Sequence, residues 1–154
     1  VYKLYLLYIF MNSRKLLSML ILAFSILGII FSVFTIFNHY AVEDNSFCLT
    51  DKGTCDVVNK SVYSTFFGIP LGFLGIFYFL ATIYLAGNVY LGRHYRESIR
   101  YLFIWTGVGL IPVAYLIYVE AFKLLTFCSL CTVIHLIIGF NFVLAFSLRK
   151  RLSF

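Results

Sequence analysis

Two pairs of cysteines are the residues of this sequence whose type and spacing could do chemistry. Cys128 and Cys131 form a Cys-x-x-Cys pair near the start of an apolar segment, and Cys48 and Cys55 are separated by six residues in a more polar stretch. A Cys-x-x-Cys pair is typical of redox sites, because the short spacing lowers the pKa of a thiol and eases thiol–disulfide exchange. The two pairs therefore indicate a protein in which electrons pass from one pair to the other.

Two non-catalytic interpretations compete with this one. Cys48 and Cys55 could form a static disulfide in a membrane scaffold without enzymatic activity, and the four thiolates together could hold a zinc ion. The wide spacing of the first pair, the position of the second pair in a membrane segment and an oxidising compartment argue against zinc. We expect no metal site, and the static-disulfide interpretation stays open at this point.

The composition indicates a membrane protein. Of 154 residues, 62% are hydrophobic and 12% are charged, and a soluble domain of this length cannot bury so much apolar surface. A membrane-spanning helix needs about 20 predominantly apolar residues, and four segments qualify: residues 16–37, 66–89, 101–122 and 127–148. We predict an all-α integral membrane protein, a four-transmembrane-helix bundle with its cysteine loop at about residues 38–65.

Basic residues cluster at three places that an even number of spans brings to one side of the membrane. The clusters are Lys3, Arg14 and Lys15; Arg93, Arg96 and Arg100; and Arg149, Lys150 and Arg151. The positive-inside rule makes this side cytoplasmic. Among the acids, Glu97 falls on the inner side and Glu120 is one of five on the outer side. We predict no nucleic-acid binding, because the basic clusters are short and lie next to the spans.

This orientation predicts the side of the membrane on which the redox reaction takes place. We expect both termini in the cytoplasm, and both cysteine pairs on the outer face of the cell (plasma) membrane, where disulfides persist. The chain then divides into an N-terminal cytoplasmic or interfacial segment at residues 1–15, a four-helix unit at residues 16–148 and a basic cytoplasmic tail at residues 149–154. We assign no function to residues 1–10.

The fourth span is expected to carry the inner chemistry. Cys128 falls at its beginning, where unpaired backbone N–H groups and the helix dipole stabilise a thiolate. Cys131 lies one turn deeper, where a lipid-soluble oxidant could arrive. His135 follows Cys131 by four residues and shares its helical face. An ionisable group inside a membrane segment is a functional candidate, so His135 could donate a hydrogen bond to a quinone or relay a proton. A histidine satisfied by a neighbouring helix is the alternative.

Small residues mark the start of the second span. Gly68, Gly72 and Gly75 are expected on nearly one helical face. Such a face allows close helix packing and also leaves space for a flat ligand. Gly72 is therefore a candidate cofactor-binding residue.

A short amphipathic outer helix is predicted after Cys55. Val58, Val62, Tyr63 and Phe66 recur there at helical spacing, with polar residues on the other faces. Such a helix would lie against the membrane and could cover the mouth of the bundle.

These residues together resemble the vitamin K epoxide reductase family, most closely its prokaryotic, disulfide-forming members. The resemblance covers about residues 16–148. It rests on the order of an outer cysteine pair, a serine, a Gly-Ile-Pro segment and a late Cys-x-x-Cys pair. The matching residues are Cys55-Asp56-Val57-Val58, Ser61-Val62-Tyr63, Phe67-Gly68-Ile69-Pro70-Leu71-Gly72 and Cys128-x-x-Cys131.

The resemblance implies a helix bundle around a quinone (ubiquinone or menaquinone), with the outer loop and its short helix as a lid. It implies that Cys128 and Cys131 are the active-site pair, that Cys48 and Cys55 are a shuttle pair, and that Ser61 helps to organise the pocket. Electrons would pass from a thioredoxin-like (DsbA-like) redox protein on the outer side through both pairs to the quinone, so that the enzyme generates disulfides. Reduction of a quinone epoxide by the same cysteines is the alternative within the family.

Overall fold

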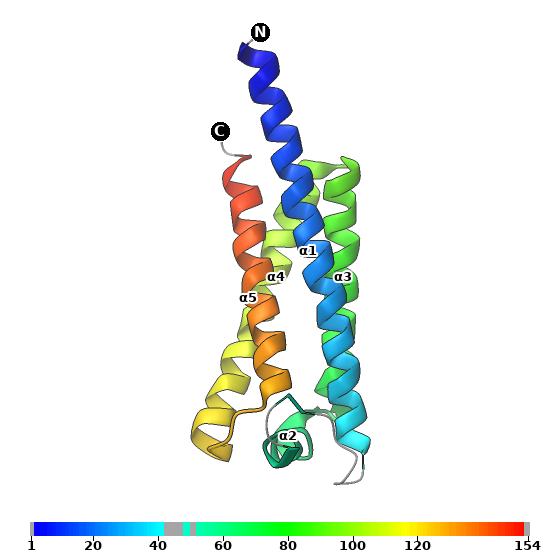
Figure 1. Ribbon diagram of the computed structural model, residues 1–154, viewed down its shortest axis with the longest axis vertical. Coiled ribbons are helices and arrows are strands. Elements are labelled where there is room, and N and C mark those ends of the chain that lie inside the picture. Colours follow the sequence, from blue (N-terminus) through cyan, green and yellow to red (C-terminus); the bar gives the residue numbers. More distant parts are fainter. Residues whose placement is uncertain (1, 42–47, 50–51, 153–154) are drawn as a thin grey trace.

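Four long helices stand side by side and form most of the protein (Figure 1). The computed structural model describes residues 2–41, 48–49 and 52–152. In chain order the elements are α1 (Tyr2–Tyr40), α2 (Lys52–Asn59), the 3-10 helix η2 (Val62–Ser64), β1 (Thr65–Phe66), β2 (Ile69–Pro70), α3 (Leu71–Leu91), α4 (Tyr95–Tyr118), the π-helix η3 (Val119–Leu124) and α5 (Ser129–Lys150). The short helix α2 lies beneath one end of the bundle, while α1 begins and α5 ends at the other (Figure 1).

Each predicted span corresponds to a helix long and apolar enough to cross a membrane. These helices are Ser13–Tyr40, Leu71–Leu91, Tyr95–Leu124 and Ser129–Lys150. The prediction of an all-α, four-helix membrane bundle is therefore confirmed. The N-terminal residues from Tyr2 onward continue α1, and this part of the helix projects past the end of the bundle (Figure 1).

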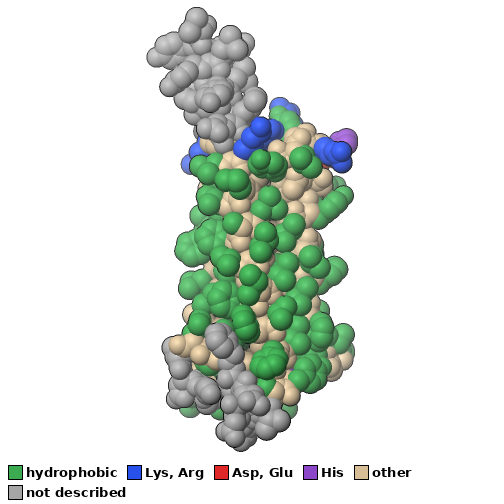
Figure 2. Space-filling view, turned by 45° about the vertical axis from the view of Figure 1, so that its right-hand side comes forward, with side chains coloured by type: hydrophobic (Ala, Val, Ile, Leu, Met, Phe, Trp, Pro, Cys, Tyr) green, Lys and Arg blue, Asp and Glu red, His purple; other side chains and the backbone are tan. Residues whose placement is uncertain are grey.

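The distribution of side chains also fits a lipid surrounding. Apolar side chains cover the flank of the bundle, and Lys and Arg side chains gather at the end where α5 ends (Figure 2). Phe77 and Ile111 are 65% and 69% exposed, which lipid accommodates better than water. Inside the bundle, Ser18, Ser25 and Ser32 follow one another every seven residues along α1 with no exposed surface. Small residues at helix interfaces let membrane helices approach closely.

The second span starts later than predicted. Residues 66–70 are apolar enough to be counted in the span, but β1 and β2 pair there as a small antiparallel hairpin. Phe67 and Gly68 have φ angles of 51° and 80°, which interrupt any helix. Pro70 then caps α3, because proline fixes φ and has no N–H to donate. Hydropathy alone cannot detect such a turn.

The predicted outer helix is also displaced. The helix is α2, which already contains Cys55 and ends at Asn59, so the prediction of a helix that begins after Cys55 is wrong. Val62 and Phe66, expected on its buried face, are 82% and 57% exposed and lie in η2 and β1. The Ser61 backbone N–H and hydroxyl both donate to the Val58 carbonyl, and these local bonds turn the chain away from a continued helix.

Glycines hold α1 and α3 close together. A Cβ atom on Gly72 would lie 2.5 Å from Cγ1 of Ile36 and 2.8 Å from the carbonyl oxygen of Ser32. A Cβ on Gly75 would lie 2.6 Å from the Ser32 hydroxyl. The close-packing interpretation therefore fits both positions. Gly68 does not share this face, contrary to the prediction, because it lies in the β1–β2 turn ahead of the helix.

Replacement of Gly72 by alanine is expected to destabilise the bundle. The added methyl group meets the backbone of α1, which cannot move aside as a flexible side chain can, and overpacking of this kind costs about 1–3 kcal/mol. The measurement is the free energy of unfolding in detergent. Gly87→Ala is the matched control on the same helix, because no atom lies within 4 Å of its added Cβ. An equal loss in both variants would contradict this account of α1–α3 packing.

Candidate active site

The outer cysteine pair is oxidised. Cys48 and Cys55 form a disulfide, as the resemblance implies. The two sulfurs differ in position, because Cys55 lies on α2 with no exposed surface whereas Cys48 is only partly buried. The helix α2 thus holds one end of the disulfide against the bundle and leaves the other nearer the surface.

The inner pair consists of two free thiols, Cys128 and Cys131. Cys128 is the N-cap residue of α5, as predicted, and its sulfur accepts a hydrogen bond from the Cys131 N–H at 3.4 Å. The same sulfur lies 3.5 Å from the Cys55 sulfur. The two pairs therefore meet through these two buried atoms, and thiol–disulfide exchange requires such an approach of one sulfur to another.

The surroundings of Cys128 favour its thiolate. The hydrogen bond from the Cys131 side chain is the largest cause that lowers the pKa of Cys128, and the backbone N–H groups of Cys131 and Leu130 add to it. Burial and the charge of Glu120 act in the opposite direction without cancelling the effect. A lowered pKa keeps a larger thiolate fraction at any pH below the ordinary value, so Cys128 is suited to exchange with Cys55.

Replacement of Cys131 by alanine is expected to raise the pKa of Cys128, since it removes the main hydrogen-bond donor to the thiolate. With a higher pKa, the Cys128 thiolate of the variant becomes protonated at a higher pH than that of the parent protein, so it loses its reactivity sooner when the pH is lowered. The measurement is the ultraviolet absorbance of the thiolate during a pH titration, in a Cys48→Ala/Cys55→Ala background that removes the outer pair. An unchanged midpoint for Cys128 would contradict the role given to the Cys131 thiol.

Two polar residues that the sequence did not single out hold the sulfurs in place. The Asn59 side chain donates to the Cys55 carbonyl at 3.0 Å and lies 3.7 Å from the Cys128 sulfur. The Ser129 hydroxyl lies 3.2 Å from the Cys48 sulfur and accepts the N–H of Leu49 at 3.3 Å. Asn59 is 69 residues from Cys128, and Ser129 is 81 residues from Cys48. Only the folded structure reveals these pairings.

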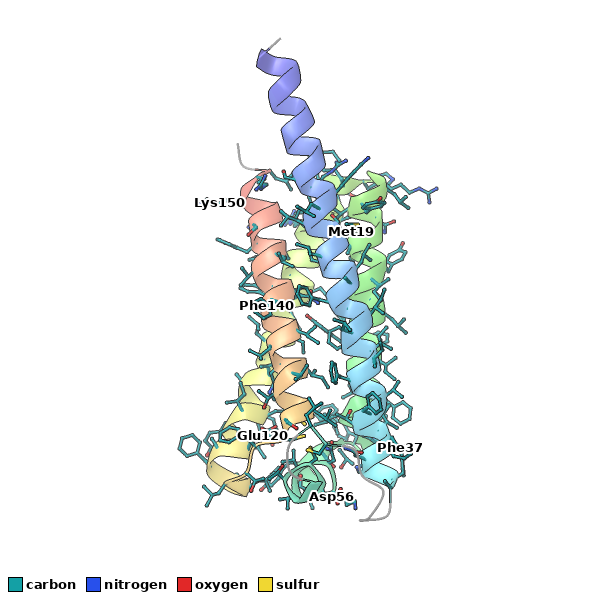
Figure 3. All side chains as sticks on the ribbon, in the orientation of Figure 1. Met19, Phe37, Asp56, Glu120, Phe140 and Lys150 are labelled. Carbon is teal, nitrogen blue, oxygen red and sulfur yellow. A yellow bond between two sulfur atoms is a disulfide. The ribbon has the colours of Figure 1, made fainter. Side chains whose placement is uncertain are left out.

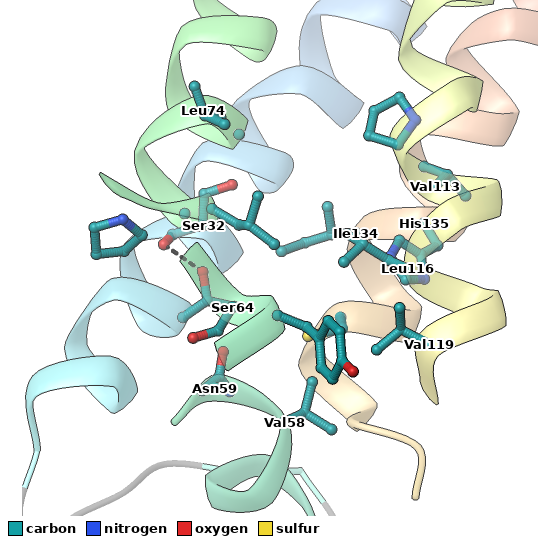
Figure 4. Close-up of a pocket in the computed structure, with 18 of the residues that line it drawn as sticks. Ser32, Val58, Asn59, Ser64, Leu74, Val113, Leu116, Val119, Ile134 and His135 are labelled. Atoms are coloured by element: carbon teal, nitrogen blue, oxygen red, sulfur yellow. Dashed lines mark hydrogen bonds between the residues drawn. The ribbon is translucent and has the colours of Figure 1, made fainter. Parts of the chain in front are cut away.

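A cavity of about 200 Å³ opens beside the inner pair. Four of the predicted site residues line it together: Cys131, Ser61, Gly72 and His135. Ser32 on α1 and His135 on α5 face it from opposite sides, with Val113 and Leu116 of α4 nearby (Figure 4). Cys128 does not line the cavity, so the two thiols of the inner pair face different neighbours: Cys128 faces the outer disulfide, and Cys131 faces the cavity.

The lining of the cavity is mainly apolar with a few polar groups, which is the usual character of a small-molecule site. The Ser32 hydroxyl is buried and has no hydrogen-bond partner among the described residues. A buried donor without a partner is costly, so this hydroxyl fits an oxygen acceptor on a bound ring. Within the described part of the chain, no three His, Cys, Asp or Glu side chains are grouped to hold a metal ion.

Glu120, which was predicted only as an outer-side charge, also lines this cavity. It lies on η3 and is 2% exposed. Its carboxylate accepts a hydrogen bond from the Cys128 N–H. Glu120 lies at the same end of the bundle as Asp56 of α2, and Lys150 lies at the opposite end (Figure 3).

Comparison with known proteins identifies one family. The family model described as Vitamin K epoxide reductase family matches residues 19–146. No curated protein and no solved structure matched the chain in the corresponding searches. The matched range contains both cysteine pairs, the cavity-lining residues and most of the four spans.

Proposed function

The chain belongs to the vitamin K epoxide reductase family, and on this basis we propose that it is a membrane thiol–quinone oxidoreductase that generates disulfides. Family membership makes the protein an oxidoreductase, and its four apolar helices make it a multi-pass membrane protein. The observation that carries the finer proposal is the 3.5 Å approach of the Cys128 and Cys55 sulfurs. It links an outer disulfide to a thiol pair beside a cavity.

Electrons enter at the outer pair. A reduced thioredoxin-like (DsbA-like) protein attacks the Cys48–Cys55 disulfide at Cys48, the less buried of its two sulfurs. The sulfur of Cys55 is released as a thiolate. In the oxidised enzyme this thiolate attacks Cys128, opens the Cys128–Cys131 disulfide and frees Cys131, so that Cys55 and Cys128 are now bonded. The second thiol of the partner attacks the bond between the partner and Cys48, and the partner leaves oxidised. The released Cys48 thiolate then attacks Cys55, which re-forms the outer disulfide and frees Cys128. Each step exchanges one thiolate for another, so no electron is lost between the partner and the inner pair.

Electrons leave from the inner pair. A quinone, when bound, accepts two electrons and two protons. Cys131 lies at the cavity wall and is the sulfur placed to deliver the electrons, and Cys128 then bonds to Cys131 to restore the disulfide. Ser32 and His135 are placed to hydrogen-bond ring oxygens from opposite sides of the cavity, and Gly72 leaves room for the ring.

The orientation in the membrane is part of the proposal. The basic clusters in the first part of α1, around the junction of α3 and α4, and at the C-terminal end of α5 lie at the end opposite to α2 (Figures 1 and 2). By the positive-inside rule this end is cytoplasmic, and the cysteines face the outside of the plasma membrane. Residues 16–148 then form the catalytic unit, a range close to the one that the family model matches.

The test is a coupled assay under anaerobic conditions. The purified protein is incubated with a reduced thioredoxin-like protein and a soluble ubiquinone or menaquinone analogue, and quinone absorbance is followed together with the thiols of the partner. We expect one quinone to be reduced for each disulfide formed in the partner. Thiol oxidation without quinone reduction under anaerobic conditions would refute the assignment.

A second candidate activity is reduction of a quinone epoxide, which the name of the matched family favours. It would use the same cysteines and cavity, with electrons supplied by the partner. The same assay with vitamin K epoxide in place of the quinone distinguishes the two, because epoxide turnover forms quinone instead of consuming it.

A further inference from the structure

We propose that Glu120 carries one of the two protons that leave the inner thiol pair as the quinone is reduced. This role rests on the proposed function and adds a proton path to it. Glu120 is a buried residue that lines the cavity together with Cys131 of the inner pair.

The backbone around Glu120 explains its position. α4 continues into the π-helix η3, Val119–Leu124, and the wider turns of a π-helix often occur at functional sites. The Glu120 carbonyl accepts the N–H groups of Leu125 and Thr126, which closes η3 just before the chain returns to Cys128. This short return brings the carboxylate of the third span to the N-terminus of the fourth.

Glu120 interacts with both cysteines of the inner pair. Its carboxylate accepts the backbone N–H of Cys128, and its charge acts on both Cys128 and Cys131. It is also part of the cavity wall with Cys131 and His135. The carboxyl group therefore lies in the wall of the same cavity as the sulfur that gives up electrons.

The burial of Glu120 calls for a functional explanation. The residue is 2% exposed, and among the described Lys and Arg side chains none forms an ion pair with it. A buried carboxylate without a cation is costly, and ionisable groups within membrane segments are typically functional. Binding and release of a proton is a function that a buried carboxyl group in an apolar site can perform.

The chemistry balances with Glu120 as carrier. When Cys128 and Cys131 form their disulfide, two S–H bonds break and one S–S bond forms. Two electrons pass to the quinone, and two protons must reach its oxygens. The proton of Cys131, which lines the cavity, passes to the acceptor directly. Glu120 takes the other proton, from Cys128, and releases it toward the cavity, so that two protons reach the acceptor and Glu120 is unchanged at the end of the cycle.

Other titratable groups lie around the same site, and their protonation also contributes to the pH dependence of quinone reduction. On the elements that line the cavity they are His39 of α1, Tyr63 of η2, Tyr78 of α3, and Cys131 and His135 of α5. Asp56 of α2 forms an ion pair with Lys60, which directly follows that helix, and Lys123 is on η3 itself. Among the described residues that line the cavity, Glu120 is the only carboxyl group.

The test compares Glu120→Gln with two other variants. Glutamine keeps the size of the side chain and can accept the Cys128 N–H, but it carries no proton. We expect reduction of a soluble ubiquinone analogue by the pre-reduced enzyme to slow by about 10- to 100-fold, in the range of general acid–base catalysis, while Cys55–Cys128 exchange changes less than about twofold. Glu120→Asp should recover part of the rate. Glu97→Gln, an exposed change on α4, should keep the wild-type rate.

A second measurement needs no quinone. Because the charge of Glu120 raises the pKa of Cys128, Glu120→Gln should lower that pKa in a thiolate titration. If the wild type reduces the quinone and Glu120→Gln reduces it equally fast, the role of Glu120 is overturned while the proposed function stands. Equal slowing of exchange and quinone reduction, with an unchanged Cys128 titration, also overturns it in favour of a structural role. Absence of quinone reduction by the wild type overturns the proposed function and this role with it.

Discussion

Replacement of Cys131 by alanine is expected to abolish quinone reduction. Cys131 is the thiol of the inner pair that lines the cavity, while the Cys128 sulfur faces Cys55. Without Cys131 no inner disulfide can form, and the electrons have no sulfur from which to reach the acceptor. Loss of a covalent catalytic group reduces turnover by on the order of 1,000-fold or more. The measurement is anaerobic, single-turnover quinone absorbance with pre-reduced protein.

Two controls separate redox chemistry from packing. Cys131→Ser keeps the size and a hydrogen-bond donor but cannot form a disulfide, so it should be as inactive as the alanine variant. Leu136→Ala changes an exposed side chain of the same helix and should keep the wild-type rate. Quinone reduction that survives in Cys131→Ala would show that another group delivers the electrons.

Replacement of Cys48 by alanine is expected to block the protein partner while sparing a small dithiol. Cys48 is the accessible end of the outer disulfide, and a folded partner cannot reach the fully buried sulfurs of Cys55 and Cys128. A small dithiol such as dithiothreitol can enter through the cavity that Cys131 lines. We expect the partner-dependent rate to fall by on the order of 100-fold, and the dithiothreitol-dependent rate to stay largely intact.

Leu49→Ala is the matched control, since Leu49 is the exposed neighbour of Cys48 and contributes no sulfur. Its rates with both reductants should equal those of the wild type. If Cys48→Ala lost activity equally with the partner and with dithiothreitol, the outer disulfide would be a structural link and not an entry point for electrons.

Much of the fold can be predicted from the sequence, because a lipid surrounding restricts which residues a spanning segment can contain. A span must be apolar over its whole length, so the four helices are visible as runs of residues. The N-cap position of Cys128 follows from where the last run begins. The Cys48 and Cys55 pair, Gly72 and His135 were predicted from residue type and spacing. The role of Ser61 depended on the resemblance to a family, and the structure places Ser61, Gly72 and His135 around one cavity.

The failures have a common physical cause, which is that local patterns do not report contacts between distant segments. Val58, Val62 and Phe66 have helical spacing, yet hydrogen bonds of Ser61 and a turn at Gly68 place them in three different elements. Glu120 lies near the outer end of the third span and was predicted only as an outer-side charge. Its burial depends on the π-helix that folds it back onto the start of α5, and no periodicity in the sequence indicates that helix.

The measurement that tests the central claim most directly uses the double variant Cys48→Ala/Cys131→Ala, which keeps only Cys55 and Cys128. After mild oxidation, the protein is digested without reduction and its linked peptides are identified by mass spectrometry. Because the two sulfurs lie 3.5 Å apart, we predict nearly complete conversion to an intramolecular Cys55–Cys128 disulfide. Two thiols that stay free, or that link only between molecules, would contradict the transfer of electrons between the two pairs.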